Sequence, residues 1–349
     1  MTIIYFILIL GITVLIHELG HFIFAKRAGI YVYEFSIGMG PVIKKWKSKK
    51  DETEYAIRLL PIGGAVSLAG ESVEEDKSIP KNKLLQNKTW MQRFWTIIAG
   101  ILFNFLLAIV VFFIGALISG ATKPNAYISF IDEDLPAFNS SLKAGDEVLK
   151  LNGKKVNADI FLLKLMVNKN KEATFTVKHE DGNIEEIKIT PTKIDDSYRF
   201  GFGIKVETEK GFLVSLKYAF TKFWSLIVQM SHIICYLFTG AIGLSSLSGP
   251  VGIFNVIGET AKAGETVIGV FTNLLFLLGY ISLNVGFVNL LPIPAFDGGR
   301  LLFLLIEKIK GSPVSTKIEN TIHTVGLFLL LGLMVLVTYN DIVRLIVKK

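Results

Sequence analysis

Two histidines and a glutamate stand close together in the segment His17-Glu18-Leu19-Gly20-His21. On a helix, residues four positions apart share a face, so both imidazoles can bind one metal ion. Glu18 is one residue along and can reach a metal-bound water. We therefore interpret His17 and His21 as zinc ligands and Glu18 as a general base. The alternative is a pair of histidines hydrogen-bonded between helices, which leaves costly polar groups in one turn of an apolar segment.

A catalytic zinc ion has three protein ligands and one open position, so a third ligand must come from elsewhere. Asp297 stands in Asn289-Leu-Leu-Pro-Ile-Pro-Ala-Phe-Asp297-Gly-Gly-Arg300. Its prolines interrupt a helix, and its glycines permit close approach of backbone. We expect Asp297 to be the third ligand; the alternative is a solvated aspartate beside Arg300 at a helix end. The remaining histidines are expected to be structural or solvated: His179, His232 and His323.

The chain that positions these residues is too apolar for a protein that faces water throughout. Its 349 residues are 51% hydrophobic and 19% charged. Uncharged runs over 96–118, 267–295 and 321–340 can each cross about 30 Å of hydrocarbon, and the apolar segment 3–24 contains the histidine pair. This excludes a soluble enzyme. We predict a polytopic α-helical membrane protein with about four transmembrane helices.

The distribution of charge predicts an orientation in the membrane. Lys and Arg outnumber Asp and Glu by thirteen to eight between residues 26 and 93, whereas the balance is fourteen to fifteen between 119 and 211. Cytoplasmic loops are basic, so we expect residues 26–93 inside, and the N-terminus and residues 119–208 outside. No basic run is interleaved with aromatic residues, which argues against a nucleic-acid partner. The single cysteine, Cys235, excludes an intramolecular disulfide and is expected to be a buried thiol.

Four parts are expected along the chain. Residues 1–118 form an N-terminal membrane part with a cytoplasmic-side β-hairpin region at 54–68, and residues 119–208 form an extracytoplasmic α+β module of short strands and glycine turns. Residues 209–262 are an interfacial or re-entrant amphipathic segment, and residues 263–349 form a C-terminal membrane part. If 223–244 crossed the membrane, Asp297 would lie on the face opposite His17. We therefore prefer an interfacial or re-entrant segment, although the sequence leaves a span open.

The motifs resemble those of the bacterial site-2 protease family, RseP-like branch. They are the histidine pair, Gly100-Ile-Leu-Phe-Asn104, a single PDZ-like module, Ser248-Gly-Pro-Val-Gly-Ile253, and the segment 289–299. The resemblance covers nearly the whole chain. It implies an intramembrane zinc endopeptidase with one Zn²⁺ on His17, His21 and Asp297 and with Glu18 as catalytic base. Phe296 stands where the family usually has leucine.

The same resemblance implies transmembrane proteins or peptides as substrates, such as anti-sigma factors or remnant signal peptides. It places the chain in the lipid of the cell membrane, with the active site toward the cytoplasm. A helix in lipid has its carbonyls hydrogen-bonded, so a substrate must be unwound before cleavage. A strand edge near Gly64 could hold it by strand addition. We expect further substrate contacts from Asn289, whose alternative role is a hydrogen bond between helices, and from Asn104.

Three other functions remain open from the sequence. A membrane-anchored zinc protease acting on loops or soluble segments would share the histidine motif. A transporter or channel would explain polar groups in apolar spans, but it would tolerate Glu18→Gln. A scaffold that displays the PDZ-like module would hold structural zinc or none. The sequence leaves open the substrate, the oligomeric state, the need for a prior cleavage, and whether the module binds peptide.

Overall fold

The computed structural model describes residues 1–47, 52–71, 78–168, 170–194 and 197–347. Lys49 and Lys50, part of the basic cluster in the segment that we expect to be cytoplasmic, lie outside the described residues. The chain forms two compact units. The first unit contains residues 1–111 and 245–349, and the second unit contains residues 112–244.

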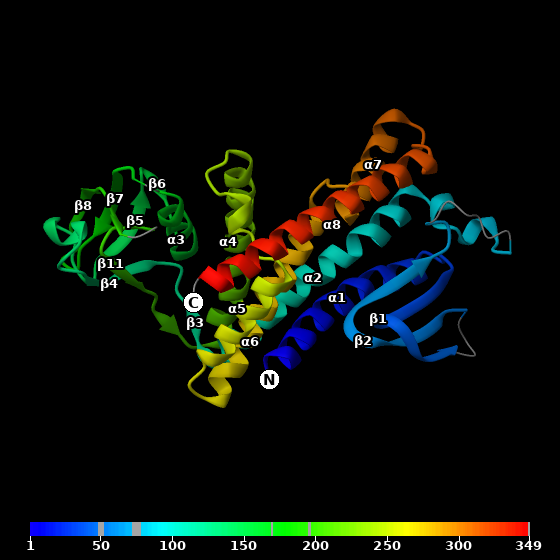
Figure 1. The fold of residues 1–349 in the computed structure, drawn as a ribbon, viewed down its shortest axis with the longest axis horizontal. Coiled ribbons are helices and arrows are strands. Elements are labelled where there is room, and N and C mark those ends of the chain that lie inside the picture. Colours follow the sequence, from blue (N-terminus) through cyan, green and yellow to red (C-terminus); the bar gives the residue numbers. More distant parts are fainter. Residues whose placement is uncertain (48–51, 72–77, 169, 195–196, 348–349) are drawn as a thin grey trace. The chain divides into compact units, whose positions relative to one another are not determined.

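Within the described ranges, four helices are long and apolar enough to cross a membrane. They are α1 (Thr2–Arg27), α2 (Trp90–Ser119), α6 (Val267–Leu290) and α8 (Thr316–Val347). The chain is therefore a multi-pass membrane protein, as the uncharged runs predicted. Residues from α1, α2, α6 and the shorter helix α5 (Pro250–Lys262) share one apolar cluster, which includes Ile9, Val111, Ile257 and Leu278. In Figure 1, α1 and α2 run alongside each other from this cluster toward the β-hairpin.

A close approach of α1 and α2 follows from small residues on both helices. A Cβ atom at Gly20 would lie 2.5 Å from the backbone oxygen of Ala99. A Cβ atom at Gly100 would overlap the ring of His21. The glycine within the histidine motif and the first glycine of Gly100-Ile-Leu-Phe-Asn104 therefore let the two backbones meet beside the two histidines.

The hairpin after α1 is made of two long, bent strands, β1 (Val32–Lys47) and β2 (Glu54–Leu68). β1 pairs with both halves of β2, so that Ile37 faces Gly64 on one side and Ile57 on the other. The second half of β2 therefore forms one edge of the sheet. The sequence analysis expected a hairpin within 54–68, and this was wrong: that stretch is the single bent strand β2, and its partner is β1. β1 was not predicted, because the lysines at its exposed end indicated a cytoplasmic loop. Two short 3-10 helices, η1 (Lys81–Lys83) and η2 (Leu85–Asn87), precede α2.

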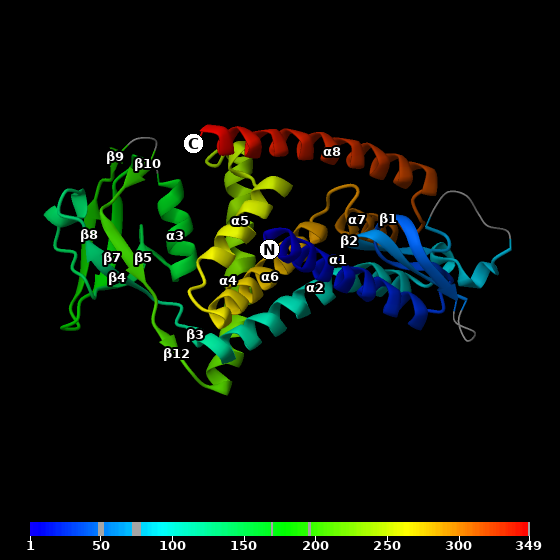
Figure 2. The ribbon, with the colours of Figure 1, turned by 60° about the horizontal axis from the view of Figure 1, so that its bottom comes forward.

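Three shorter helices complete the C-terminal half of the first unit. They are η4 (Leu244–Ser246), which lies at the boundary of the units, α5 (Pro250–Lys262) and α7 (Asp297–Lys310). Pro250 stands at the start of α5, where its missing N–H costs nothing. α5 packs against α1, α6 and α8. Figure 2 shows α8 passing α7 and ending beside α5.

The second unit is built around a six-stranded antiparallel sheet of order β11-β4-β5-β7-β8, with β6 paired to β5. The buried side chains of its core include Ile128, Phe161, Phe175 and Val177. The strands predicted at 147–151 and 184–189 and the helix predicted at 160–167 lie where expected. The strands of the unit are β3 (Ala121–Thr122), β4 (Ala126–Ile131), β5 (Glu147–Leu151), β6 (Lys154–Lys155), β7 (Ala173–Lys178), β8 (Ile184–Ile189), β9 (Thr192–Ile194), β10 (Ser197–Arg199), β11 (Phe202–Lys205) and β12 (Thr208–Glu209), and its helices are η3 (Pro136–Asn139), α3 (Ala158–Val167) and α4 (Phe212–Phe238).

The segment 209–262, expected as one interfacial element, is divided between the units. α4 belongs to the second unit, where Asp159 of α3 binds Lys222 at 2.6 Å and Ser225 at 2.9 Å. α5 belongs to the first unit. Cys235 on α4 is exposed, so the expectation of a buried thiol was wrong. An apolar helix buries only the face that another element covers, and Cys235 lies on an uncovered face.

Candidate metal centre and active site

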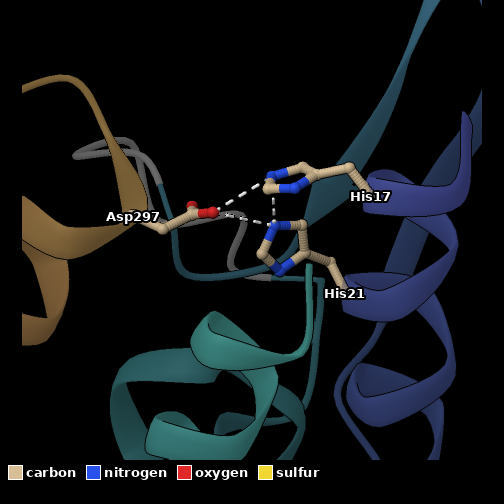
Figure 3. A group of neighbouring side chains, drawn as sticks. All are labelled: His17, His21 and Asp297. Carbon is tan, nitrogen blue, oxygen red and sulfur yellow. Dashed lines mark hydrogen bonds and ion pairs between the residues drawn. The ribbon is translucent and has the colours of Figure 1, made fainter. Parts of the chain in front are cut away.

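Three side chains from α1 and α7 converge on one point in the first unit. Nε2 of His17 lies 3.0 Å from Oδ2 of Asp297, and Nε2 of His21 lies 3.3 Å from the same oxygen. The two Nε2 atoms are 3.2 Å apart. Figure 3 shows both rings and the carboxylate turned toward this common point. The structure therefore brings together the three residues that the sequence indicated as metal ligands.

The spacing of these atoms fits a tetrahedral zinc ion. Ligand atoms about 2.0–2.1 Å from zinc at tetrahedral angles are separated by about 3.3 Å. Oδ2 of Asp297 is buried and accepts no well-aligned hydrogen bond from a described residue, although two imidazoles lie beside it. Three electron-pair donors at this spacing favour a cation between them. The residues present therefore fit a zinc ion with two imidazole ligands and one carboxylate ligand.

The far side of each imidazole is held by α2. Nδ1 of His21 lies 2.8 Å from the backbone oxygen of Thr96 and can donate its proton there. The side-chain amide of Asn104 lies 3.2 Å from Nδ1 of His17. A histidine that binds metal through Nε2 carries its proton on Nδ1, and the amide can turn its oxygen toward that proton. Such contacts fix the tautomer and the ring orientation of metal-binding histidines.

The segment between α6 and α7 brings Asp297 to α1. α6 ends at Leu290, and Asp297 is the first residue of α7. A Cβ atom at Gly298 would overlap the backbone oxygen of Leu291, and a Cβ atom at Gly299 would lie 2.6 Å from that of Ile293. The two glycines after Asp297 therefore let the start of α7 fold back on the segment that leads into it.

The charge state of Asp297 suits a metal ligand. Burial raises the pKa of its carboxyl group, but the adjacent imidazoles of His21 and His17 outweigh burial and hold the pKa well below its usual range. Asp297 is therefore ionised near neutral pH.

One turn along α7, Arg300 forms an ion pair with Glu71, which follows β2. This pair ties the start of α7 to the end of the hairpin.

A cavity of about 390 Å³ opens beside His17, His21 and Asp297. Its lining includes Glu18, Asn289, Arg300 and the second half of β2 from Gly64 to Val66. Glu18 is close to β2, because its Cγ would lie 3.4 Å from a Cβ atom at Gly64. The cavity therefore combines the three candidate metal ligands, the Glu18 carboxyl group and a strand edge.

The three expected substrate contacts occupy different environments. Gly64 and Asn289 line the cavity, and the amide of Asn289 forms no hydrogen bond with another described residue. Asn104 does not line the cavity: it is fully buried behind His17. Thr96 was not indicated by the sequence, because the group it supplies is a backbone oxygen. Glu71 and Arg300 were visible in the sequence only as an acidic loop residue and a basic neighbour of Asp297.

Comparisons with known proteins agree with this chemistry. The model of a family described as peptidase family M50 matches residues 5–333. The chain is 36% identical over 352 residues to a Fusobacterium nucleatum protein named as a zinc metalloprotease, with 99% of both chains covered. It is 37% identical over 347 residues to a similarly named protein of Clostridium perfringens, covering 98% of this chain and 99% of the relative. It is 32% identical over 425 residues to the regulator of sigma-W protease RasP of Bacillus subtilis, with 99% of both covered.

Proposed function

The chain belongs to peptidase family M50, the site-2 proteases, and from this premise we propose that it hydrolyses peptide bonds within or near the transmembrane segments of other membrane proteins. It is a zinc metalloprotease. The observation that carries the proposal is the convergence of His17, His21 and Asp297 beside membrane-spanning helices.

We assign one zinc ion to these three residues, with the cavity side left open for water and substrate. When bound, zinc lowers the pKa of water toward about 7 and polarises a carbonyl group. Glu18, which lines the same cavity, accepts the proton of the attacking water and delivers it to the leaving amine. The free amide of Asn289 donates a hydrogen bond to the carbonyl oxygen of the substrate, where negative charge develops.

The substrate binds as an extended strand in this proposal. β1 pairs with residues 64–68 along one edge of this part of β2, and Gly64, Ala65 and Val66 line the cavity. A strand added here would replace the helical hydrogen bonds that the substrate loses. Proline at Ala65, Val66 or Ser67 removes one N–H at a time. We expect at least one of these variants to lose cleavage and keep its zinc; full turnover in all three would count against strand addition.

The orientation follows from charge. Lys26 and Arg27 end α1, and the metal ligands lie toward the same end of that helix. We place this end at the cytoplasmic face and the near-neutral second unit outside, as a PDZ-like module that limits the size of substrates. On a Cys235→Ser background, a membrane-impermeant maleimide added to intact cells should label Lys154→Cys and not Lys81→Cys. The reverse pattern would invert the topology.

Anti-sigma factors or remnant signal peptides fit the proposal as substrates, since both are transmembrane segments. The first experiment is elemental analysis of purified wild type, His21→Ala and Asp297→Ala. We expect one zinc per wild-type chain and weaker zinc in both variants. Full zinc affinity in Asp297→Ala would mean that Asp297 is not the third zinc ligand.

Cleavage near lipid needs a separate test, because a membrane-anchored protease for loops would share the zinc site. One scissile sequence is placed either inside a transmembrane segment or in its soluble flank, and both substrates are reconstituted in vesicles with the enzyme. Intramembrane proteolysis predicts preferential cleavage of the first substrate. Preferential cleavage of the second would favour the loop protease. Glu18→Gln is the negative control in both cases.

A further inference from the structure

The segment that carries Asp297 contains an unusual backbone conformation. Ala295 has a φ of 77°, in the left-handed region. The only other non-glycine residue with positive φ in the described part of the chain is Asn152, in a turn of the second unit. Asparagine visits this region readily, but alanine does not, because its Cβ approaches the backbone. Such a conformation persists only where its surroundings impose it.

His323 on α8 contacts the backbone at Ala295. Its Nδ1 accepts the N–H of Ala295 at 2.9 Å, so the proton of the neutral ring is on Nε2. Nε2 is buried and has no hydrogen-bond partner among the described residues. The bond to Ala295 is thus the polar contact that the ring makes within the described structure. The ring also lies against Phe303 of α7, with centroids 5.7 Å apart.

α8 contacts the backbone on both sides of Ala295. A Cβ atom at Gly299 would lie 3.1 Å from Cε1 of His323, and a Cβ atom at Gly326 would overlap Pro294. Residues 323 and 326 are three positions apart and share one helix face. This face of α8 therefore meets the segment before Asp297 and the start of α7 at once.

We propose that His323 is a positioning residue for the metal ligand Asp297. By accepting the N–H of Ala295, it holds the left-handed turn that aims the carboxylate, two residues later, at His17 and His21. Its role differs from that of a fourth ligand, because Nδ1 is occupied by Ala295 and the ligand cluster is complete without it. The assignment of a metal to this cluster rests on the proposed function; the bond from His323 to Ala295 does not.

Three variants separate this role from packing. His323→Leu keeps much of the ring's volume and removes the acceptor, whereas His323→Asn keeps an acceptor near the position of Nδ1. His323→Leu combined with Ala295→Gly removes the acceptor and also the penalty for positive φ. His232→Leu is the matched control, since the His232 ring bonds within its own helix to the Val228 oxygen.

The first readout needs no metal. Hydrogen exchange of the Ala295 amide is measured in zinc-free protein, with thermal unfolding as a check that each variant is folded. We expect exchange about ten-fold faster in His323→Leu than in wild type, and near wild type in His323→Asn and His232→Leu. Equal protection in wild type and His323→Leu would overturn the proposal, whatever the zinc experiments give.

The second readout reports the geometry of the site. Cobalt(II) replaces zinc, and its visible absorption and its rate of release to a chelator are recorded. His323→Leu should alter the spectrum and release metal about ten-fold faster, and Ala295→Gly should recover part of this loss. An unchanged spectrum in His323→Leu, or a loss in His323→Asn as large as in His323→Leu, would overturn the role. If wild type binds no metal in this experiment, the proposed function fails instead, and the exchange result still decides the contact.

Discussion

Arg93 and Glu307 form an ion pair through both carboxylate oxygens, with Nη1 of Arg93 2.9 Å from Oε1 and 2.8 Å from Oε2. Both side chains are mostly buried. Beside this pair, Nε1 of Trp90 donates to the backbone oxygen of Leu304 at 2.8 Å. These contacts fix the later turns of α7 to the first turn of α2. α7, whose first residue is Asp297, is thereby anchored at both ends.

Removal of one partner of this pair should destabilise the first unit. Glu307→Gln removes the carboxylate that is paired with Arg93 in a mostly buried site, and we expect a loss of roughly 2–4 kcal/mol in the free energy of unfolding. The check is unfolding in detergent. The double variant Arg93→Met with Glu307→Leu should be closer to wild type in stability than Arg93→Met alone or Glu307→Leu alone. If the two single losses simply add, the ion pair is not coupled.

The acid–base role of Glu18 can be separated from metal binding. Glu18→Gln keeps the shape of the side chain and removes the proton acceptor, so kcat should fall by about 10²–10⁴-fold while one zinc per chain remains. The measurement pairs cleavage of a reconstituted substrate with elemental analysis. A rate within a few-fold of wild type would place proton transfer on another group.

The two asparagines near the centre should behave differently. Asn104→Ala removes the contact that orients His17 and should weaken zinc binding about 10–100-fold. Asn289→Ala should leave zinc binding unchanged and lower kcat/KM, because this amide faces the cavity and not a ligand. Asn284→Ala is the control, since that side chain is half-buried and bonds within its own helix to the backbone oxygen of Tyr280. Equal zinc loss in Asn104→Ala and Asn289→Ala would contradict the assignment.

Asp341 on α8 should contribute to stability through the start of α5. Its buried Oδ2 accepts the N–H groups of Gly249 and Gly252, each at 2.8 Å. A carboxylate at a helix N-terminus accepts hydrogen bonds from the free N–H groups and interacts favourably with the helix dipole. Asp341→Ala should lower the free energy of unfolding by about 1–3 kcal/mol, and Asp341→Asn by less, without changing zinc content. Thermal unfolding with zinc analysis tests both parts, and a zinc loss without destabilisation would refute them.

The second unit should lose stability as pH rises above about 6.5. His179 lies 2.8 Å from Oδ1 of Asp146 and 3.1 Å from Oε2 of Glu185, and these hydrogen bonds raise the pKa of His179. The stabilising contribution of the imidazolium is complete below its unfolded pKa of about 6.5 and is lost as pH rises through the raised value.

The test is thermal unfolding of the full chain between about pH 5 and pH 9, monitored with a spectroscopic probe in the second unit. Wild type should lose stability over the upper part of this range, and His179→Gln should lack that component. Identical pH profiles for the two proteins would exclude the ion pair as the cause.

The sequence predicted most of what depends on local pattern. The spacing of His17 and His21 fixed their common face, and the four apolar runs correspond to the four long helices. Asp297 was expected on the same face as His17 from a count of crossings, and its carboxylate lies beside both imidazoles. The role that each ligand plays stays a prediction until zinc is measured in variants.

The remaining features depend on contacts between distant segments. β1 was missed because its lysines are typical of loops, although pairing with β2 satisfies their backbone groups. His323 was expected to be structural or solvated, and its contact is with a backbone N–H that no side-chain pattern reveals. Asp341 directly follows the uncharged run 321–340 in the sequence, and only the fold brings it to Gly249.

The distribution of ligands along the chain also sets an order of events during synthesis. His17 and His21 emerge with the first helix, whereas Asp297 belongs to α7 and is contacted from the still later α8 through Ala295 and His323. A nascent chain that has inserted only its first helices offers two imidazoles and no complete zinc site. With zinc held by His17, His21 and Asp297 as proposed, the protease becomes competent only when its last helices are in place, and incomplete chains would not cut the membrane proteins made around them.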